Sequence, residues 1–133
     1  MPMINVTCAV IVSQTNQVLV TQRSATMKLP LKWEFPGGKM EYGETPAACL
    51  TREIKEELNV DINIGSALQP YAHHYPDFSI NLIPFICEII GGEIALSEHA
   101  QYLWLNPTAL LNLDWAEADI PIVKNYLTFL NEI

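Results

Sequence analysis

The stretch that decides the fold is WEFPGGKMEYGETPAACLTREIKEELNV, residues 33–60, in which a glycine turn leads into a helix rich in glutamate. Thr45 is a favoured N-cap residue, and Pro46 follows at the first helical position, where proline sacrifices no hydrogen bond. The helix is expected to run to about Leu58. Asn59 then stands where a left-handed closing residue is needed, and asparagine is the usual substitute for glycine there.

The predicted helix has two adjoining faces. An apolar stripe that can pack on a sheet comprises Ala47, Leu50, Ile54 and Leu58. Beside it, an arc of about 100° holds the carboxylates of Glu53, Glu56 and Glu57. These carboxylates either form an ordinary solvated face or share a hard cation with backbone carbonyls of the glycine turn. Mg²⁺ favours such oxygen ligands and is the usual companion of nucleotide phosphates.

The strands are predicted from β-branched runs and from the turn residues between them. They are expected at residues 6–12, 17–22, 33–35, 62–73, 80–90 and 102–105. The first two are separated by the polar turn SQTN and are expected to form an early hairpin. Asn106 and Pro107 can open a short helical turn.

A last helix is predicted at residues 120–130, where apolar side chains recur at the spacing of one buried face. They are Val123, Tyr126, Leu127 and Leu130. The order of elements describes an α/β protein with a mixed sheet flanked by helices.

The composition indicates one domain over residues 1–133, because the chain is 50% hydrophobic and short. Its formal net charge of −8 and its scattered basic residues argue against nucleic-acid binding. We find no signal-peptide pattern and no apolar run of the roughly 20 residues that cross a bilayer, so a cytoplasmic protein without a membrane partner is expected. Cys8, Cys49 and Cys87 lack the spacing of a disulfide framework or a zinc site.

The glycine turn and the helix together form a recognisable pattern. Gly38, Glu44 and the run REIKEELNV at 52–60 closely resemble the Nudix box, G-x5-E-x7-R-E-U-x-E-E-x-G-U, where U is a bulky aliphatic residue. Only Asn59 departs from a fixed position, at the final glycine, and the capping argument makes this tolerable.

The resemblance extends beyond the box, to the MutT-like branch of the family. Matching segments are TQR at 21–23, EFPGGK at 34–39, YPD at 75–77, the glutamate at 98 and ADIPIV at 118–123. The resemblance implies the Nudix fold, an α/β/α sandwich around a mixed β-sheet.

The resemblance also implies a site for Mg²⁺, with Mn²⁺ as a substitute. Its metal ligands would be the Gly37 carbonyl with Glu53, Glu56, Glu57 and Glu98. Glu53 is the expected general base and Glu98 the alternative. The guanidinium fork of Arg52 is expected to pair with Glu44 and to fix the helix against the turn.

Substrate contacts follow from the same resemblance. Arg23 and Lys39 are the cations available for phosphate, although either can equally be an ordinary surface residue. Asp119 falls where MutT-like enzymes read the base. As a carboxylate it only accepts hydrogen bonds and suits the amino group of cytosine, whereas as a neutral acid it also donates, like the asparagine of 8-oxoguanine-directed relatives. A simple helix cap is the alternative.

Aromatic residues could stack on the base. By resemblance these are Phe35, Phe78 and Trp115, and the competing interpretation places them in the core. Phe78 departs from relatives strict for 8-oxo-dGTP, which can carry arginine after PD. The three histidines lack ligand-like spacing, and no role is assigned to them.

The predicted function is that of a Mg²⁺-dependent nucleoside triphosphate pyrophosphohydrolase, releasing the monophosphate and pyrophosphate. Its expected substrates are oxidised dNTPs such as 8-oxo-dGTP, CTP and 5-methyl-dCTP, or both sets. Two alternatives remain at this point: a catalytically silent nucleotide-sensing or protein-binding Nudix domain, and a hydrolase of ADP-ribose or another nucleoside diphosphate derivative. The chain is expected to be a monomer or a homodimer.

Overall fold

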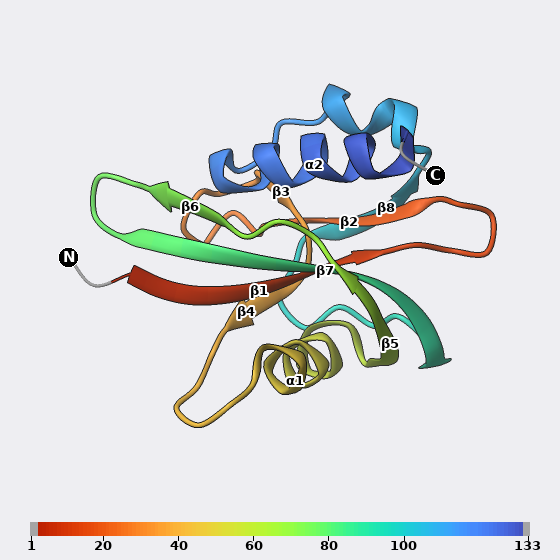
Figure 1. Cartoon of the computed structure of the whole chain (residues 1–133), viewed down its shortest axis with the longest axis horizontal. Coiled ribbons are helices and arrows are strands. Elements are labelled where there is room, and N and C mark those ends of the chain that lie inside the picture. Colours follow the sequence, from red (N-terminus) through yellow and green to blue (C-terminus); the bar gives the residue numbers. More distant parts are fainter. Residues whose placement is uncertain (1–2, 132–133) are drawn as a thin grey trace.

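The computed structural model describes residues 3–131 and confirms the α/β/α sandwich. In Figure 1, α2 covers one side of the strands and α1 the other. The elements are β1 (Met3–Ile11), β2 (Val18–Gln22), β3 (Trp33–Glu34), β4 (Gly37–Lys39), α1 (Pro46–Leu58), β5 (Val60–Ala67), β6 (Tyr71–His74), β7 (Ser79–Gly92), β8 (Gln101–Leu105), the 3₁₀ helices η1 (Pro107–Asn112) and η2 (Glu117–Asp119), and α2 (Ile120–Asn131).

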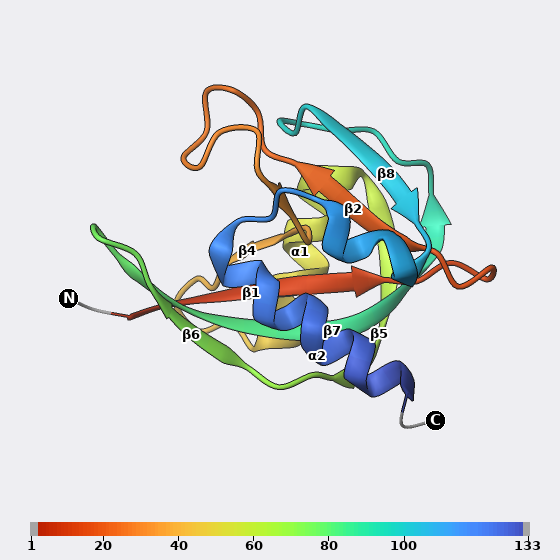
Figure 2. The same ribbon diagram turned by 90° about the horizontal axis from the view of Figure 1, so that it is seen from above.

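The larger sheet is mixed, as predicted. Its strand order is β4-β1-β7-β5, and β6 also pairs with β7. β1 runs parallel to β7 over its whole length, from Met3 opposite Ser79 to Ile11 opposite Cys87, while the other pairings in this sheet are antiparallel. A second sheet has the order β3-β2-β8. Figure 2 shows β2 and β8 side by side, beyond the edge of α2.

The early hairpin predicted for residues 6–12 and 17–22 is wrong as a paired unit. The two strands meet only at the bridge between Val12 and Val18 and then belong to different sheets. Both edges of β1 are occupied by other segments: β7 lies along one edge, and β4 and the carbonyl of Pro36 take the other. β2 therefore pairs with β3 and β8 instead.

The single strand predicted at 62–73 is two strands. β5 pairs with the second half of β7, and β6 pairs with its first residues. The register of β5 also shifts after Asp61 and after Ile64. Pro70 stands in the break between the strands, where a residue without an N–H cannot contribute to a ladder. Because β7 is 14 residues long, it serves as a partner for both.

Helix α1 begins and ends as its caps predict. The Thr45 side chain accepts a hydrogen bond from the N–H of Ala48 at 3.1 Å, and Pro46 is the first helical residue. Asn59 closes the helix in the left-handed conformation, with φ of 61°. The departure from the Nudix pattern at this position is thus accommodated by the backbone geometry that glycine would otherwise supply.

The predicted apolar stripe of α1 needs one correction. Ala47 is exposed, and the buried residues are Cys49, Leu50, Ile54 and Leu58. The helix is turned so that the Cys49 thiol lies 3.3 Å from the Thr7 hydroxyl and 3.4 Å from the Lys39 carbonyl. Contact with β1 and β4 therefore buries Cys49 and leaves Ala47 exposed.

Two apolar clusters lie on opposite sides of the larger sheet. Alternate residues of β1 serve the two sides, because successive side chains of a strand point to opposite faces. Cys8 and Val10 join the cluster beneath α2, whereas Ala9 and Ile11 join the cluster beneath α1.

The C-terminal region follows its prediction. Asn106 precedes η1, and α2 spans the expected last helix. Val123 and Tyr126 are buried, and Leu127 and Leu130 pack partly buried against the same cluster. Within residues 3–131, neither helix has the length and apolar character that a membrane span requires.

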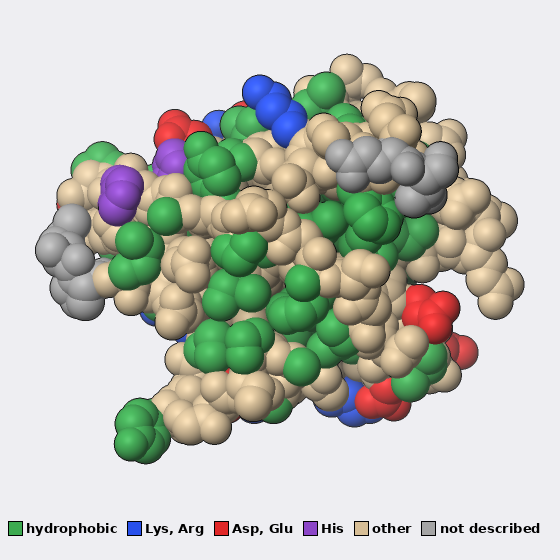
Figure 3. All heavy atoms as spheres, viewed as in Figure 1, with side chains coloured by type: hydrophobic (Ala, Val, Ile, Leu, Met, Phe, Trp, Pro, Cys, Tyr) green, Lys and Arg blue, Asp and Glu red, His purple; other side chains and the backbone are tan. Residues whose placement is uncertain are grey.

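Hydrophobic and charged side chains occupy different parts of the face seen in Figure 1. Figure 3 shows hydrophobic side chains over the middle of this face, between the two helices, and charged side chains towards its margins. A surface of this kind offers little to a polyphosphate.

The cap at Asn59 gives a first prediction. Replacing Asn59 with Ala should lower the free energy of unfolding by about 1 kcal/mol, because an L-residue with an ordinary side chain resists the left-handed conformation. Asn59→Gly should stay close to wild type. Urea denaturation of the three proteins measures both effects, and equal stabilities for Ala and Gly at this position would contradict the proposed role of the backbone angle.

Candidate functional site

The glycine turn is pressed between β1 and α1. A Cβ atom at Gly37 would collide with the carbonyl oxygen of Thr7, and one at Gly38 would collide with the Glu53 carboxylate. The Thr7 hydroxyl donates to the Gly38 carbonyl at 3.4 Å, which also fixes the turn on β1. The two glycines therefore allow a close approach that brings the Glu53 carboxylate directly against the backbone of β4.

Arg52 and Glu44 form the fork expected from the sequence. The Arg52 Nε atom donates to Glu44 Oε2 at 2.7 Å, and a terminal nitrogen donates to Oε1 at 2.8 Å. The same guanidinium donates to the Lys39 carbonyl at 3.2 Å, so it ties the loop, the turn and the helix together. These hydrogen bonds from Arg52, followed by one from the Glu41 N–H, lower the pKa of Glu44 to about 2.

Arg52 also contacts two of the predicted metal ligands. Its remaining terminal nitrogen lies 2.8 Å from Glu53 Oε1 and 3.3 Å from Glu56 Oε2. The guanidinium thus partly balances the charge of the acidic helix face. It also holds the two carboxylates on the side of the helix that meets the turn.

Among residues 3–131, Glu57 lacks a basic partner at hydrogen-bond distance such as Glu53 has in Arg52, and it faces His99 Nδ1 at 4.0 Å. The N–H of Gly37 donates to Glu57 Oε1 at 3.1 Å. Burial raises the pKa of Glu57 well above its ordinary value, and the nearby carboxylates of Glu34 and Glu53 raise it further. A cation at this position would relieve both effects.

A small cavity of about 190 Å³ gathers the predicted acidic ligands. Its lining comprises Met27, Glu53, Glu56, Glu57, Ser97, Glu98 and His99. Within the part of the chain that the structure describes, no three acidic, histidine or cysteine side chains already stand close enough together to hold a metal ion. The donor set nevertheless fits a hard divalent cation in its chemistry, since the acids are oxygen donors whose mutual repulsion Arg52 balances only in part.

His99 and Glu34 are site residues that the sequence analysis missed. His99 is 7% exposed, and its Nε2 atom lies 2.8 Å from Glu34 Oε2. Its Nδ1 atom is buried, has no hydrogen-bond partner among residues 3–131, and faces Glu57 Oε2 at 4.0 Å. The spacing of the three histidines gave no signal, because the partners of His99 are 65 and 42 residues away in the chain. The only local signal was its place directly after Glu98.

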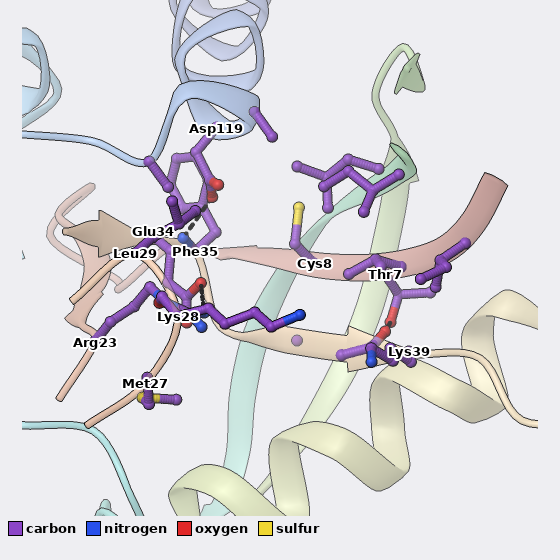
Figure 4. A pocket seen from close by; sticks show the side chains of 18 of the residues that line it. Thr7, Cys8, Arg23, Met27, Lys28, Leu29, Glu34, Phe35, Lys39 and Asp119 are labelled. Carbon is purple, nitrogen blue, oxygen red and sulfur yellow. Dashed lines mark hydrogen bonds and ion pairs between the residues drawn. The ribbon is translucent and has the colours of Figure 1, made fainter. Parts of the chain in front are cut away.

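A larger cavity of about 330 Å³ lies beside the first, in the size range of small-molecule sites. Figure 4 shows Asp119 near one end and Lys39 near the other, with Lys28 extending across the space between them. Both cavities are lined by Met27 and Glu57. The two spaces therefore meet at the acidic helix.

Asp119 is buried at the end of the larger cavity that α2 covers. Its Oδ2 atom accepts a hydrogen bond from the N–H of Phe35 at 2.9 Å, so this oxygen holds the β3–β4 segment and not the helix N-terminus. Burial raises the pKa of Asp119 well above its ordinary value, and the Glu34 carboxylate raises it further. The environment thus favours the neutral acid, which can donate as well as accept.

The three predicted aromatic residues have different positions. Phe35 and Phe78 line the larger cavity. Trp115 lies behind Phe35, with ring centroids 4.8 Å apart, and its indole N–H donates to the Leu110 carbonyl. Phe78 stacks on Tyr75 at 4.8 Å. The cavity wall therefore offers two of the three rings, and Trp115 supports one of them.

The predicted cations both line the larger cavity. Arg23 pairs with Glu34 at 2.8 Å and also donates to the carbonyl of Lys28. Lys39 is exposed at the glycine turn. Lys28 is a third cation, unexpected from the sequence, and its Nζ atom lies 4.9 Å from the centre of the Phe78 ring.

Comparisons with known proteins agree with this architecture. Residues 1–126 match the family model described as the NUDIX domain. The CTP pyrophosphohydrolase of Escherichia coli (strain K12) is 30% identical over 127 residues, which cover 96% of this chain and 93% of that protein. The 8-oxo-dGTP diphosphatase of the same strain is 29% identical over 123 residues, covering 92% and 95%.

A solved structure shows the same similarity. The NMR structure of the DNA mismatch repair protein MutT from methicillin-resistant Staphylococcus aureus 252 superposes with a TM-score of 0.77 at 41% identity, over 96% of this chain and 97% of that one. The similarity spans both chains almost entirely.

The Arg52–Glu44 fork predicts a pH-dependent stability. Glu44 is more acidic in the folded protein than in the unfolded chain, so the unfolded chain takes up its proton first. The stabilisation is complete above about pH 5 and declines as the pH falls towards 2. Thermal unfolding should therefore show wild type more stable than Glu44→Gln at pH 7, with a difference that shrinks across this window. A difference that stays constant from pH 7 to pH 2 would contradict this account.

Proposed function

The chain belongs to the NUDIX family and is a Nudix hydrolase, and on this premise we propose that it is a Mg²⁺-dependent nucleoside triphosphate pyrophosphohydrolase. Its role would be the sanitation of the nucleotide pool. The observation that carries the proposal is the pair of adjoining cavities, one partly apolar with a buried Asp119 and one acidic, which meet at Glu57. This arrangement suits a molecule with a base at one end and phosphates at the other.

The phosphate end is expected to lie along the glycine turn. A bound Mg²⁺ would neutralise charge on the phosphate oxygens, which is the main requirement of phosphoryl substitution. Glu53, Glu56, Glu57, Glu98 and the Gly37 carbonyl would hold it. Arg23, Lys28 and Lys39 are the cations on the cavity wall that can contact the polyphosphate directly.

The proposed reaction is attack by water on a phosphorus of the triphosphate. The new P–O bond forms as the bond to the departing pyrophosphate breaks, and the proton of the water passes to Glu53. Glu53 is suited to this role because its carboxylate lies against Gly38 and is oriented by Arg52 at 2.8 Å. Arg52 and Glu44 act by positioning, since Arg52 binds Glu44, the turn and the carboxylates of the helix.

The base is proposed to be read by Asp119 in its neutral form. One oxygen is engaged by the N–H of Phe35, which leaves the other to donate or accept in the cavity. Such a group suits 8-oxo-dGTP, and it can also serve the cytosine of CTP and 5-methyl-dCTP. Phe35 and Phe78 offer the apolar walls for the ring.

Replacing Glu53 with Gln tests the proposed reaction. The amide cannot accept the proton, so kcat should fall at least about 100-fold while the fold is retained. Release of pyrophosphate from 8-oxo-dGTP and CTP in millimolar Mg²⁺ measures this effect, and Glu93→Gln, at an exposed acid outside the cavities, is the matched control. A rate close to wild type for Glu53→Gln would overturn the assignment of the base. Tight nucleotide binding without any pyrophosphate release by wild type would instead indicate a silent sensing domain.

Replacing Asp119 tests how the base is read. Asparagine reproduces the donor and acceptor of a neutral acid, so Asp119→Asn should keep kcat/KM for 8-oxo-dGTP near wild type. Asp119→Ala leaves a buried partner unmatched and should lower it about tenfold or more. The assay compares 8-oxo-dGTP, 2-oxo-dATP, CTP, 5-methyl-dCTP and ADP-ribose, with Asp61→Asn as a surface control.

The same assay exposes the alternatives. A selective loss of CTP turnover in Asp119→Asn would show that the carboxylate acts as an ionised acceptor. Fastest turnover of ADP-ribose by wild type would identify a hydrolase of nucleoside diphosphate derivatives and overturn the triphosphate assignment.

A further inference from the structure

His99 links the two cavities through a row of charged side chains. Its Nε2 atom lies 2.8 Å from Glu34 Oε2, and the other oxygen of Glu34 lies 2.8 Å from Arg23. Arg23 and Glu34 line the larger cavity, whereas His99 lines the acidic one. Glu34 comes from β3 and Arg23 from the end of β2, while His99 precedes β8. The row therefore depends on the small sheet for its geometry.

The other side of the imidazole is unused. The Nδ1 atom of His99 is buried and has no hydrogen-bond partner in the part of the chain that the structure describes, and the side chain is only 1% exposed. It faces Glu57 Oε2 at 4.0 Å, about 1 Å beyond hydrogen-bond distance. A buried polar nitrogen normally has a partner, so this atom requires an explanation.

The Glu57 carboxylate is held at one oxygen only. The N–H of Gly37 binds Oε1 at 3.1 Å, and Oε2 points towards His99. A shift of Oε2 by about 1 Å towards His99 would bring it within hydrogen-bond distance of Nδ1. The imidazole would then hold the oxygen of Glu57 that the Gly37 N–H does not bind.

We propose that His99 is a positioning residue, which fixes the Glu57 carboxylate for a divalent cation and connects it through Glu34 to Arg23 at the nucleotide cavity. This inference rests on the proposed function and adds to it a residue that acts through Glu57. Groups that orient a metal-binding carboxylate commonly change metal affinity by 10-fold or more when they are replaced. Histidine suits the position because its imidazolium form carries a donor on each nitrogen and can therefore bind two carboxylates at once.

Two substitutions separate the two sides of the imidazole. The amide of glutamine reaches about as far as Nε2, so His99→Gln can keep the contact with Glu34 and lose the group that faces Glu57. The shorter amide of asparagine lies near the position of Nδ1, so His99→Asn does the reverse. The pair is matched in polarity and hydrogen-bonding capacity.

The test is a titration of each protein with Mn²⁺ alone, in which electron paramagnetic resonance measures the free ion. His99→Gln should raise the Kd for Mn²⁺ about 10-fold, whereas His99→Asn should bind close to wild type. The ¹⁵N resonance of His99 Nδ1 in wild type should also shift when Mg²⁺ is added. This second measurement keeps the inference testable if either variant fails to fold.

The outcomes distinguish this inference from the proposed function. Wild-type binding of Mn²⁺ that both variants leave unchanged, or that both weaken equally, would overturn the role of His99 and leave the metal site standing. An Nδ1 resonance that Mg²⁺ does not move would do the same. Failure of wild type to bind Mn²⁺ at all would overturn the proposed function together with the inference.

Discussion

The glycine turn is packed closely between β1 and α1, and this packing controls how near the acidic face of α1 lies to the sheet. A Cβ atom at Gly37 would collide with the backbone carbonyl of Thr7, and one at Gly38 would displace the Glu53 carboxylate. The backbone of β4 can therefore lie against the acidic face of α1. In the absence of a Cβ, the Gly37 N–H reaches Glu57 and the Gly38 carbonyl accepts from Thr7. The turn thus sets the separation between the sheet and the helix.

Charge balance in the site follows from this packing. Arg52 is joined to Glu44, Glu53 and Glu56, so much of the negative charge of the helix has a partner within the protein. Glu57 is different, because it is enclosed near Glu34 and Glu53 and lacks a basic side chain at hydrogen-bond distance among the described residues. This unbalanced position is where a cation contributes most, and it is also where the two cavities meet. In the proposed function, a cation bound there would allow a protein of formal net charge −8 to accept a polyphosphate.

The larger cavity is lined by a buried acid, basic side chains and aromatic rings. Asp119 is buried beside the Glu34 carboxylate, yet Glu34 is itself bound by Arg23 and His99. Arg23 consequently binds Glu34 and also lines the cavity. Lys28, lying over Phe78, is a cation whose only described partner is an aromatic ring, so a phosphate can compete for it at low cost. In the proposed function, the base end and the phosphate end of the cavity would therefore be connected through the same few side chains.

Elements whose signals are local could be predicted from the sequence alone. Thr45, Pro46 and Asn59 set the ends of α1 through contacts within a few residues, and the spacing of Val123 and Tyr126 set the buried side of α2. The Arg52–Glu44 fork was also foreseeable, since both residues flank one loop and one helical turn. The box pattern placed the chain in its family for the same reason: its residues lie within one short stretch.

Strand pairings and buried contacts between residues distant in the chain could be read only from the folded structure. The separation of β1 from β2 into two sheets followed from competition for the edges of β1, and Cys49 replaced Ala47 in the buried stripe because β1 and β4 met the helix at that side. The position of His99 depends on the packing of β3, α1 and β8 against one another. Local patterns record the conformation of a segment, whereas strand pairing and buried charge contacts are settled by which distant groups can satisfy each other's hydrogen bonds.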